Sequence, residues 1–132
     1  MLVPSYLIQK QKRALELYTQ GCYQEALDIC LQVIHDHPDI SDAWTYAAFN
    51  CGRLNRWQEA IRYGQGALTH GANTFAIYDI LARGYGELKQ WDKARHYGLQ
   101  ALEMRDRLFG GKPVIPLAEP GPMPPLPSTQ TR

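Results

Sequence analysis

The sequence LNRWQEA at residues 54–60 returns as LKQWDKA at residues 88–94, and a looser copy, QGCYQEA, occupies residues 20–26. Each copy ends in an alanine, and the spacing is constant (60 − 26 = 94 − 60 = 34) between Ala26, Ala60 and Ala94. A fixed period of this length is typical of stacked repeat proteins, in which each unit buries its apolar face only against its neighbours. The sequence therefore predicts three consecutive units of one structural repeat.

Each unit contains two segments with helical periodicity. Apolar or small residues follow the i, i+3, i+4, i+7 spacing of one helical face, first at Trp44, Ala47, Ala48 and Cys51 and again at Tyr78, Leu81, Ala82 and Tyr85. A second helix follows after a short turn, and it carries the periodic alanine. The predicted units are about residues 7–40, 41–74 and 75–108.

Residues at the ends of these segments favour the start and the end of a helix. A serine or threonine side chain is expected to cap the first helix of each unit, at Ser5, Ser41 and Thr74. Pro38 and Gly71 are typical of residues that end a helix. The third unit has Asp106 where the first has a proline, so we expect its second helix to continue to about Leu108.

These residues resemble the tetratricopeptide repeat. In that family the first helix carries an aromatic residue, a leucine, a small residue and a tyrosine, and the second carries an alanine, an aromatic residue, an alanine and a proline. The resemblance implies an all-α, right-handed α-solenoid of three helix–turn–helix units. Small residues on both helices of a unit let the two backbones approach closely, and the expected pairs are Ala14 with Ala26, Ala48 with Ala60, and Ala82 with Ala94.

Two glycines depart from the family pattern. Gly64 and Gly98 stand where the repeat usually has an aromatic residue on its second helix. A glycine in a helix interior costs about 1 kcal/mol relative to alanine. We therefore expect both glycines to allow close contact with an adjacent helix.

The composition argues against several classes of function. The formal net charge is +1, from 14 Lys and Arg against 13 Asp and Glu, so no bulk field favours nucleic acid or an anionic membrane. No apolar run approaches the ~20 residues that span a bilayer, and the first residues lack the layout of a signal peptide. A cytoplasmic protein is the expectation. The three cysteines cannot all pair within one chain, and we expect them to be reduced: Cys22, Cys30 and Cys51.

Candidate catalytic and metal-binding groups are few. The most suggestive cluster is His35, Asp36, His37 and Asp39. Four ligands at the spacing of a zinc site are absent from it. The run 64–66, Gly-Gln-Gly, lies within a predicted helix and not after a strand, so it predicts no phosphate-binding loop. Cys22, near a helix start, is more simply an ordinary cysteine than a reactive thiol. The sequence therefore predicts no enzyme activity and no cofactor.

The resemblance also implies a binding surface. In this family the first helices of successive units line a concave groove that receives an extended peptide or a helix. The repeat register places nine residues on or beside the groove: Gln11, Leu15, Tyr18, Tyr46, Phe49, Arg53, Asp79, Arg83 and Glu87. A subclass of the family clamps a C-terminal carboxylate with lysine and asparagine. Its positions hold other residue types here, namely Gln11, Leu15, Tyr46, Ala76 and Ile80. We therefore expect no carboxylate clamp, and an apolar segment with acidic or carbonyl groups fits the two arginines better.

Residues 109–132 differ in composition from the repeats. Their seven prolines are Pro113, Pro116, Pro120, Pro122, Pro124, Pro125 and Pro127. Such a stretch favours a polyproline-II linker, which is a simpler interpretation of its PxxP patterns than a ligand for a recognition domain. No polar-faced closing helix, usual in the family, is visible. We therefore expect roughly residues 109–118 to fold back on the last repeat, or to pack on the same surface of a second molecule in a homodimer.

The sequence thus predicts a non-catalytic protein–protein interaction module, an adaptor or scaffold. Its partner would be a protein or peptide bound in the groove, with neither nucleic acid nor membrane as a partner. A second hypothesis stays open, in which the chain is the N-terminal targeting or oligomerisation module of a larger enzyme, a glycosyltransferase being one example. The reading frame after Arg132 distinguishes the two hypotheses.

Overall fold

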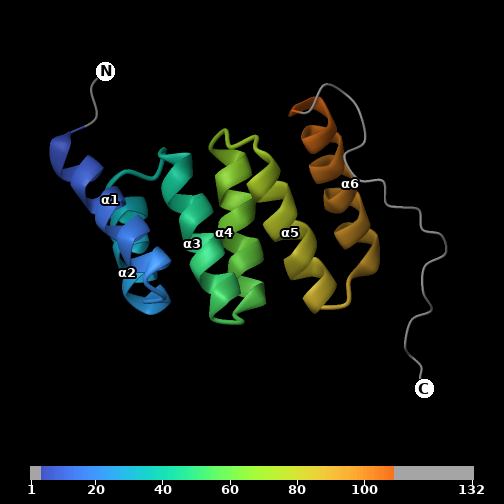
Figure 1. The fold of residues 1–132 in the computed structure, drawn as a ribbon, viewed down its shortest axis with the longest axis horizontal. Coiled ribbons are helices and arrows are strands. Elements are labelled where there is room, and N and C mark those ends of the chain that lie inside the picture. Colours follow the sequence, from blue (N-terminus) through green and yellow to red (C-terminus); the bar gives the residue numbers. More distant parts are fainter. Residues whose placement is uncertain (1–3, 109–132) are drawn as a thin grey trace.

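The computed structural model describes residues 4–108, which form six α-helices and no β-strand. The helices are α1 (Ser5–Thr19), α2 (Tyr23–Asp36), α3 (Ser41–Arg53), α4 (Trp57–Thr69), α5 (Phe75–Glu87) and α6 (Trp91–Leu108). They follow one another as three helical hairpins along the long axis of the molecule, from α1 and α2 at one end to α6 at the other (Figure 1). The predicted all-α repeat architecture is confirmed. The expectations for the proline-rich segment lie outside the described residues.

The turn inside each hairpin contains one residue with positive φ. These residues repeat with the same 34-residue period (55 − 21 = 89 − 55 = 34), and they are Gly21 (φ 84°), Asn55 (φ 61°) and Lys89 (φ 63°). The amide of the next residue then donates to a helix carbonyl five residues earlier, as in Arg56 N to Cys51 O at 2.8 Å. This is the hydrogen bond of a Schellman-type helix end. The period seen in the sequence is therefore also a period of backbone conformation.

One of the three predicted N-terminal capping residues caps its helix in the structure. Thr74 caps α5, because its hydroxyl oxygen accepts a hydrogen bond from the amide of Ile77 at 3.4 Å. The predicted caps Ser5 and Ser41 are wrong, since each is the first residue of its helix. The preceding residues, Pro4 and Ile40, have the extended backbone of a cap and give no side-chain hydrogen bond. In α1 the cap position is held by Pro4, with φ −58° and ψ 143°, so Ser5 already lies inside the helix.

The small residues form the seams between helices, with an offset from the expected pairs. Ala60 is 1% exposed, and its core cluster contains Ala47 and Cys51 of α3, whereas Ala48 belongs to a different cluster. Between α5 and α6, a Cβ placed on Gly98 would lie 3.9 Å from Cβ of Ala82. A Cβ placed on Gly86 would lie 4.0 Å from Cβ of Ala94. The predicted burial of Ala60 is confirmed. Its predicted pairing with Ala48 is corrected, because the axial offset of two antiparallel helices is set by the turn that joins them.

The glycines of α4 make room for the neighbouring helices. A Cβ on Gly64 would lie 2.8 Å from Cδ2 of Leu81, so the expected close contact is confirmed there. Gly66, for which no packing role was predicted, lies against the indole ring of Trp44 with no room for a Cβ. At Gly98 a Cβ would make only ordinary contact with Ala82. No described residue therefore requires a glycine at position 98.

Two of the three cysteines lie in the core. Cys30 and Cys51 are buried and free, and Cys22 is half-buried and free. Burial raises the pKa of the Cys30 thiol to about 12, and burial raises the pKa of the Cys51 thiol to about 11. Both side chains act as small hydrophobic residues at neutral pH.

Candidate functional site

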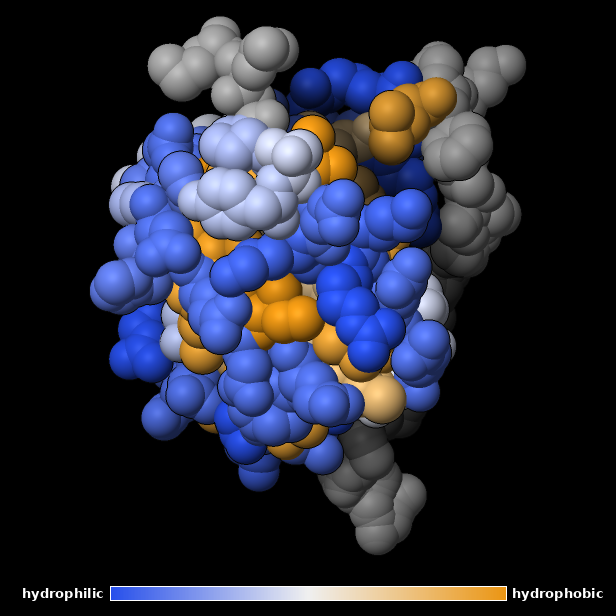
Figure 2. All heavy atoms as spheres, turned by 90° about the vertical axis from the view of Figure 1, so that its left-hand side faces the viewer, coloured by the Kyte–Doolittle hydropathy of each residue, from blue (hydrophilic) through white to orange (hydrophobic). Residues whose placement is uncertain are grey.

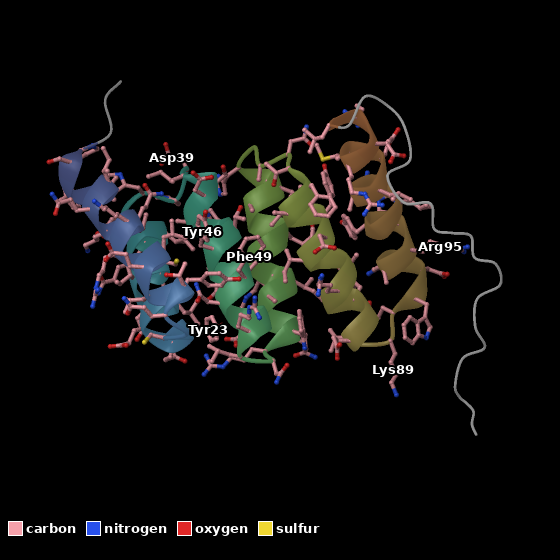
Figure 3. All side chains as sticks on the ribbon, in the orientation of Figure 1. Tyr23, Asp39, Tyr46, Phe49, Lys89 and Arg95 are labelled. Atoms are coloured by element: carbon pink, nitrogen blue, oxygen red, sulfur yellow. The ribbon has the colours of Figure 1, made fainter. Side chains whose placement is uncertain are left out.

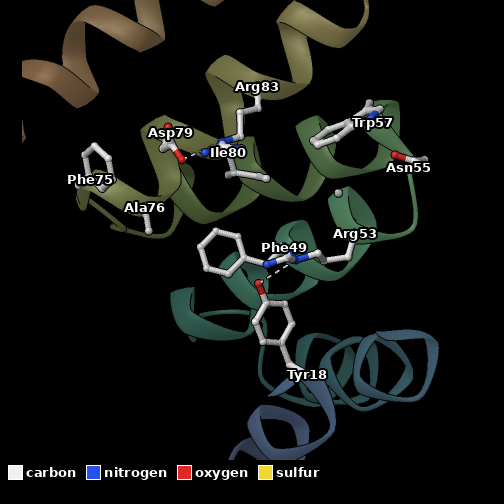
Figure 4. A pocket seen from close by; sticks show the side chains of 11 residues that line it. Tyr18, Phe49, Arg53, Asn55, Trp57, Phe75, Ala76, Asp79, Ile80 and Arg83 are labelled. Carbon is white, nitrogen blue, oxygen red and sulfur yellow. Dashed lines mark hydrogen bonds and ion pairs between the residues drawn. The ribbon is translucent and has the colours of Figure 1, made fainter. Parts of the chain in front are cut away.

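The first helices of the three hairpins line a groove of about 510 Å³ (Figure 4). Helices α1, α3 and α5 supply most of its wall, and the α3–α4 turn and the start of α4 close one side. The lining residues are Tyr18, Phe49, Gly52, Arg53, Asn55, Trp57, Phe75, Ala76, Asp79, Ile80 and Arg83. The groove is therefore built from side chains far apart in sequence that the stacking of hairpins brings together.

Five of the nine predicted groove residues lie on this wall: Tyr18, Phe49, Arg53, Asp79 and Arg83. The other four do not line it. Gln11 and Tyr46 border a small cavity beside Cys30, while Leu15 and Glu87 are exposed elsewhere on α1 and α5. The nine predicted residues are thus divided between this groove and surfaces outside it.

Gly52 explains why the sequence missed Trp57 as a groove residue. A Cβ on Gly52 would lie 3.1 Å from both the Trp57 ring and Cδ1 of Ile80. Because the glycine has no side chain, an aromatic residue of the second helix and an aliphatic residue of the next hairpin meet at the floor of the groove. In the sequence, Gly52 on a predicted first helix was the feature that could have indicated close packing by a residue of another helix.

Aromatic rings form one side of the groove. The ring centroids of Tyr18 and Phe49 lie 6.3 Å apart, and those of Tyr46 and Phe49 lie 5.8 Å apart in an edge-to-face arrangement. Figure 3 labels the latter two on α3. Edge-to-face and tilted pairs of this kind stabilise each other beyond simple burial. The apolar wall is therefore held in place before any ligand arrives.

Arg53 is fixed between two tyrosines at the edge of this wall. Its Nε donates to the Tyr18 hydroxyl at 3.4 Å, and its guanidinium carbon lies 5.8 Å from the Tyr18 ring and 5.7 Å from the Tyr23 ring. The hydrogen bond to Tyr18 raises the pKa of Arg53, and a guanidinium group is charged at physiological pH in any case. Cation–π contacts of this geometry orient an exposed arginine.

A second arginine faces the groove from α5. Nε of Arg83 lies 3.0 Å from Oδ2 of Asp79, an i,i+4 pair on the same helix and drawn as a dashed line in Figure 4. The Arg83 side chain is 67% exposed and that of Asp79 is 37% exposed, so water screens this ion pair and it adds little to stability. The groove thus presents two guanidinium groups, one carboxylate and an aromatic floor.

Within residues 4–108 no three His, Cys, Asp or Glu side chains come together as metal ligands. Among the described helices, none combines the length and apolar character needed to cross a membrane.

The comparisons with known proteins agree on the fold. A tetratricopeptide-repeat family model matches residues 74–114. Among solved structures, MamA MSR-1 matches with a TM-score of 0.69 at 19% identity, over 77% of this chain and 59% of the other. The TPR2AB-domain:pHSP90 complex of yeast Sti1 matches with a TM-score of 0.74 at 17% identity, over 83% of this chain and 43% of the other.

A third solved structure, the CopN–Scc3 complex, matches with a TM-score of 0.70 at 11% identity, over 76% of this chain and 59% of the matched chain. This chain therefore spans between two fifths and three fifths of the length of these structures. At such identities the likeness shows the fold alone. No curated protein sequence matches the chain.

Proposed function

From the tetratricopeptide-repeat fold of this chain, we propose that it is a non-catalytic protein-interaction module whose groove binds a peptide or helix of another protein. The observation that carries the proposal is the groove itself, which gathers aromatic residues and two arginines from three successive hairpins. Two of the structures with this fold are complexes, TPR2AB with pHSP90 and CopN with Scc3.

The chemistry of the groove indicates which segment it accepts. Phe49, Phe75 and Ile80 supply an apolar surface, so the ligand presents aliphatic or aromatic side chains to it. Arg53 is unpaired with any carboxylate in the described part of the chain, while Arg83 shares its charge with Asp79. A carboxylate or a backbone carbonyl of the ligand beside Arg53 completes the contact. The preferred ligand is an apolar segment with an acidic residue next to it.

Affinity capture with two matched variants tests this function. The tagged full chain is compared with a Phe49→Ala/Arg53→Ala variant and with Arg107→Ala, which removes an exposed arginine from α6, outside the groove. We expect the proteins bound by the wild type to be retained by Arg107→Ala and lost from the groove variant at unchanged helicity. An identical set of bound proteins for all three chains would place the binding surface elsewhere.

A further inference from the structure

Helix α6 exposes a face that its counterpart in the second repeat buries. The side of α4 that faces the next hairpin carries Ile61 and Gln65. A Cβ placed on Gly84 would lie 2.8 Å from Cγ1 of Ile61, and Nε2 of Gln65 donates to the hydroxyl of Tyr97 at 2.9 Å. Adding the 34-residue period gives Arg95 and Leu99 of α6. Leu99 is 60% exposed. The positions by which α4 packs on the next hairpin therefore recur on α6, where no described helix covers them.

The exposed face of α6 forms one continuous stripe. Its residues are the exposed Trp91, Arg95, Leu99 and Leu102 and the half-buried Asp106, whose Oδ1 is buried. They follow the spacing i, i+4, i+8, i+11, i+15, which keeps side chains on one side of a helix. Trp91 is 64% exposed and Leu102 is 43% exposed. Figure 3 shows Arg95 on the side of α6 that points away from the other helices. Apolar residues clustered on one exposed helix face mark an interaction surface.

The stripe is symmetric in charge as well as in shape. Arg95 and Asp106 lie at equal distances from the midpoint between Leu99 and Leu102 (95 + 106 = 99 + 102 = 201). When a second α6 lies antiparallel across that midpoint, each Leu99 meets the partner's Leu102. Each Arg95 then meets the partner's Asp106, about 8 Å from the midpoint along the axis. A surface that is complementary to itself in this way fits a two-fold interface.

At the opposite end of the stack, the α1 positions that correspond to the α5 contacts with α4 are polar. The α5 residues that contact α4 include Ile77 and Leu81, and subtracting two periods (77 − 68 = 9, 81 − 68 = 13) gives Gln9 and Arg13 of α1. The end formed by α1 and α2 shows hydrophilic residues with hydrophobic patches between them (Figure 2), and Tyr6 and Ile8 of α1 are 51% and 53% exposed. Head-to-tail stacking of copies would therefore bury polar side chains against the apolar stripe of α6. The polar residues at these two positions favour a closed pair over an open filament.

We propose that the chain forms a two-fold homodimer through α6, in which the two helices pack antiparallel with Leu99 and Leu102 at the centre and Arg95–Asp106 pairs on either side. None of these residues lines the groove. Dimerisation therefore leaves the groove of each copy available, and the dimer carries two grooves.

Charge reversal provides a specific test. Sedimentation velocity of the full chain is expected to show a dimer, and Arg95→Asp or Asp106→Arg alone is expected to raise the dimer dissociation constant about tenfold. In either single variant, two pairs of like charges face each other. The Arg95→Asp/Asp106→Arg double variant rebuilds both pairs and is expected to restore wild-type dimerisation. Within one helix the two residues are about 16 Å apart along the axis, so only contact between two copies explains such a restoration.

Two further variants separate the interface from general effects. Leu102→Glu is expected to give a monomer with unchanged helical circular dichroism. Ile8→Glu, a matched change at a 53% exposed aliphatic residue on α1, is expected to leave the dimer intact. A full chain that is monomeric at every concentration overturns the proposal, as does a dimer that survives Leu102→Glu. Single reversals that dissociate the dimer without rescue by the double variant overturn the antiparallel arrangement.

Discussion

The indole of Trp44 in α3 lies directly on the backbone of Gly66 in α4, and its Nε1 donates to the carbonyl of Pro38 at 2.7 Å. The hydrogen bond fixes the ring, so the ring cannot move to accept a side chain from α4. The position of the Trp44 ring on α3 therefore requires a glycine at position 66 of α4.

Gly66→Ala is therefore expected to destabilise the protein by about 1–3 kcal/mol, even though alanine is the better helix former. Gly98→Ala is the matched control, because its Cβ would meet only Ala82 at 3.9 Å. Without a clash, the control gains up to about 1 kcal/mol from helix propensity. Urea unfolding of both variants measures the two free energies. Equal effects of the same sign would contradict the packing of Trp44 on α4.

Ala60→Leu tests the seam between α3 and α4. Ala60 is 1% exposed and lies in a cluster with Ala47 and Cys51. Three extra carbon atoms have no space there, so overpacking is expected to reduce the free energy of unfolding by about 1–3 kcal/mol. Ala76→Leu serves as a comparison at a half-buried alanine of the groove, where the added carbons reach solvent. An unchanged thermal midpoint for Ala60→Leu would show that this seam is looser than described.

The sequence could predict the repeat and the seams, and its failures follow from physical causes. The 34-residue period fixed which residues share a face, so the six helices and the burial of Ala60 followed from it. The caps at Ser5 and Ser41 failed because backbone conformation at the preceding residue is not visible in a pattern of side chains. The alanine pairing failed because periodicity within a helix does not give the axial offset between two helices.

The groove was predictable in part for a related reason. Tyr18, Phe49 and Arg53 lie on first helices, where the register placed them. Trp57 belongs to a second helix and reaches the groove only because Gly52 leaves a gap. A contact that depends on a missing side chain in another element is not visible in the periodicity of either helix.

Arg53→Ala is expected to leave the thermal midpoint unchanged while it weakens ligand binding. The guanidinium group is exposed and makes one long hydrogen bond, to Tyr18. Its interaction with a ligand carboxylate is screened by salt, so the variant should also lose the salt dependence of binding. Phe49→Ala is expected to weaken binding at every ionic strength, because its contribution is apolar. Identical salt profiles for the wild type and Arg53→Ala would remove this arginine from the binding surface.

The buried thiols predict a stability change at high pH. Burial raises the pKa of Cys30 to about 12 and that of Cys51 to about 11, from an ordinary value of 9.0. Below pH 9 both thiols are neutral in the folded and unfolded states, and their contribution is fully present. As the pH rises above 9, the unfolded state loses these protons first, so the free energy of unfolding is expected to fall. A Cys30→Ala/Cys51→Ala variant should show a weaker fall over the same pH range in urea titrations.

Thiol labelling provides a second readout for the same residues. At pH 8 the half-buried Cys22 is expected to react with an aromatic disulfide reagent in the folded protein, and the other two thiols only after unfolding. Release of three equivalents from the native chain would contradict the burial of Cys30 and Cys51.

The left-handed residue in each hairpin turn restricts how this chain tolerates change in length. Gly21, Asn55 and Lys89 each close a three-residue link between two helices. One inserted residue would disrupt this tight turn and shift the following helix, with its alanine, relative to the seam. Substitutions to glycine or asparagine are compatible with the turn, whereas insertions and deletions are not. Any variation in length is therefore confined to the connections between hairpins, residues 37–40 and 70–74, where the chain already differs from one unit to the next.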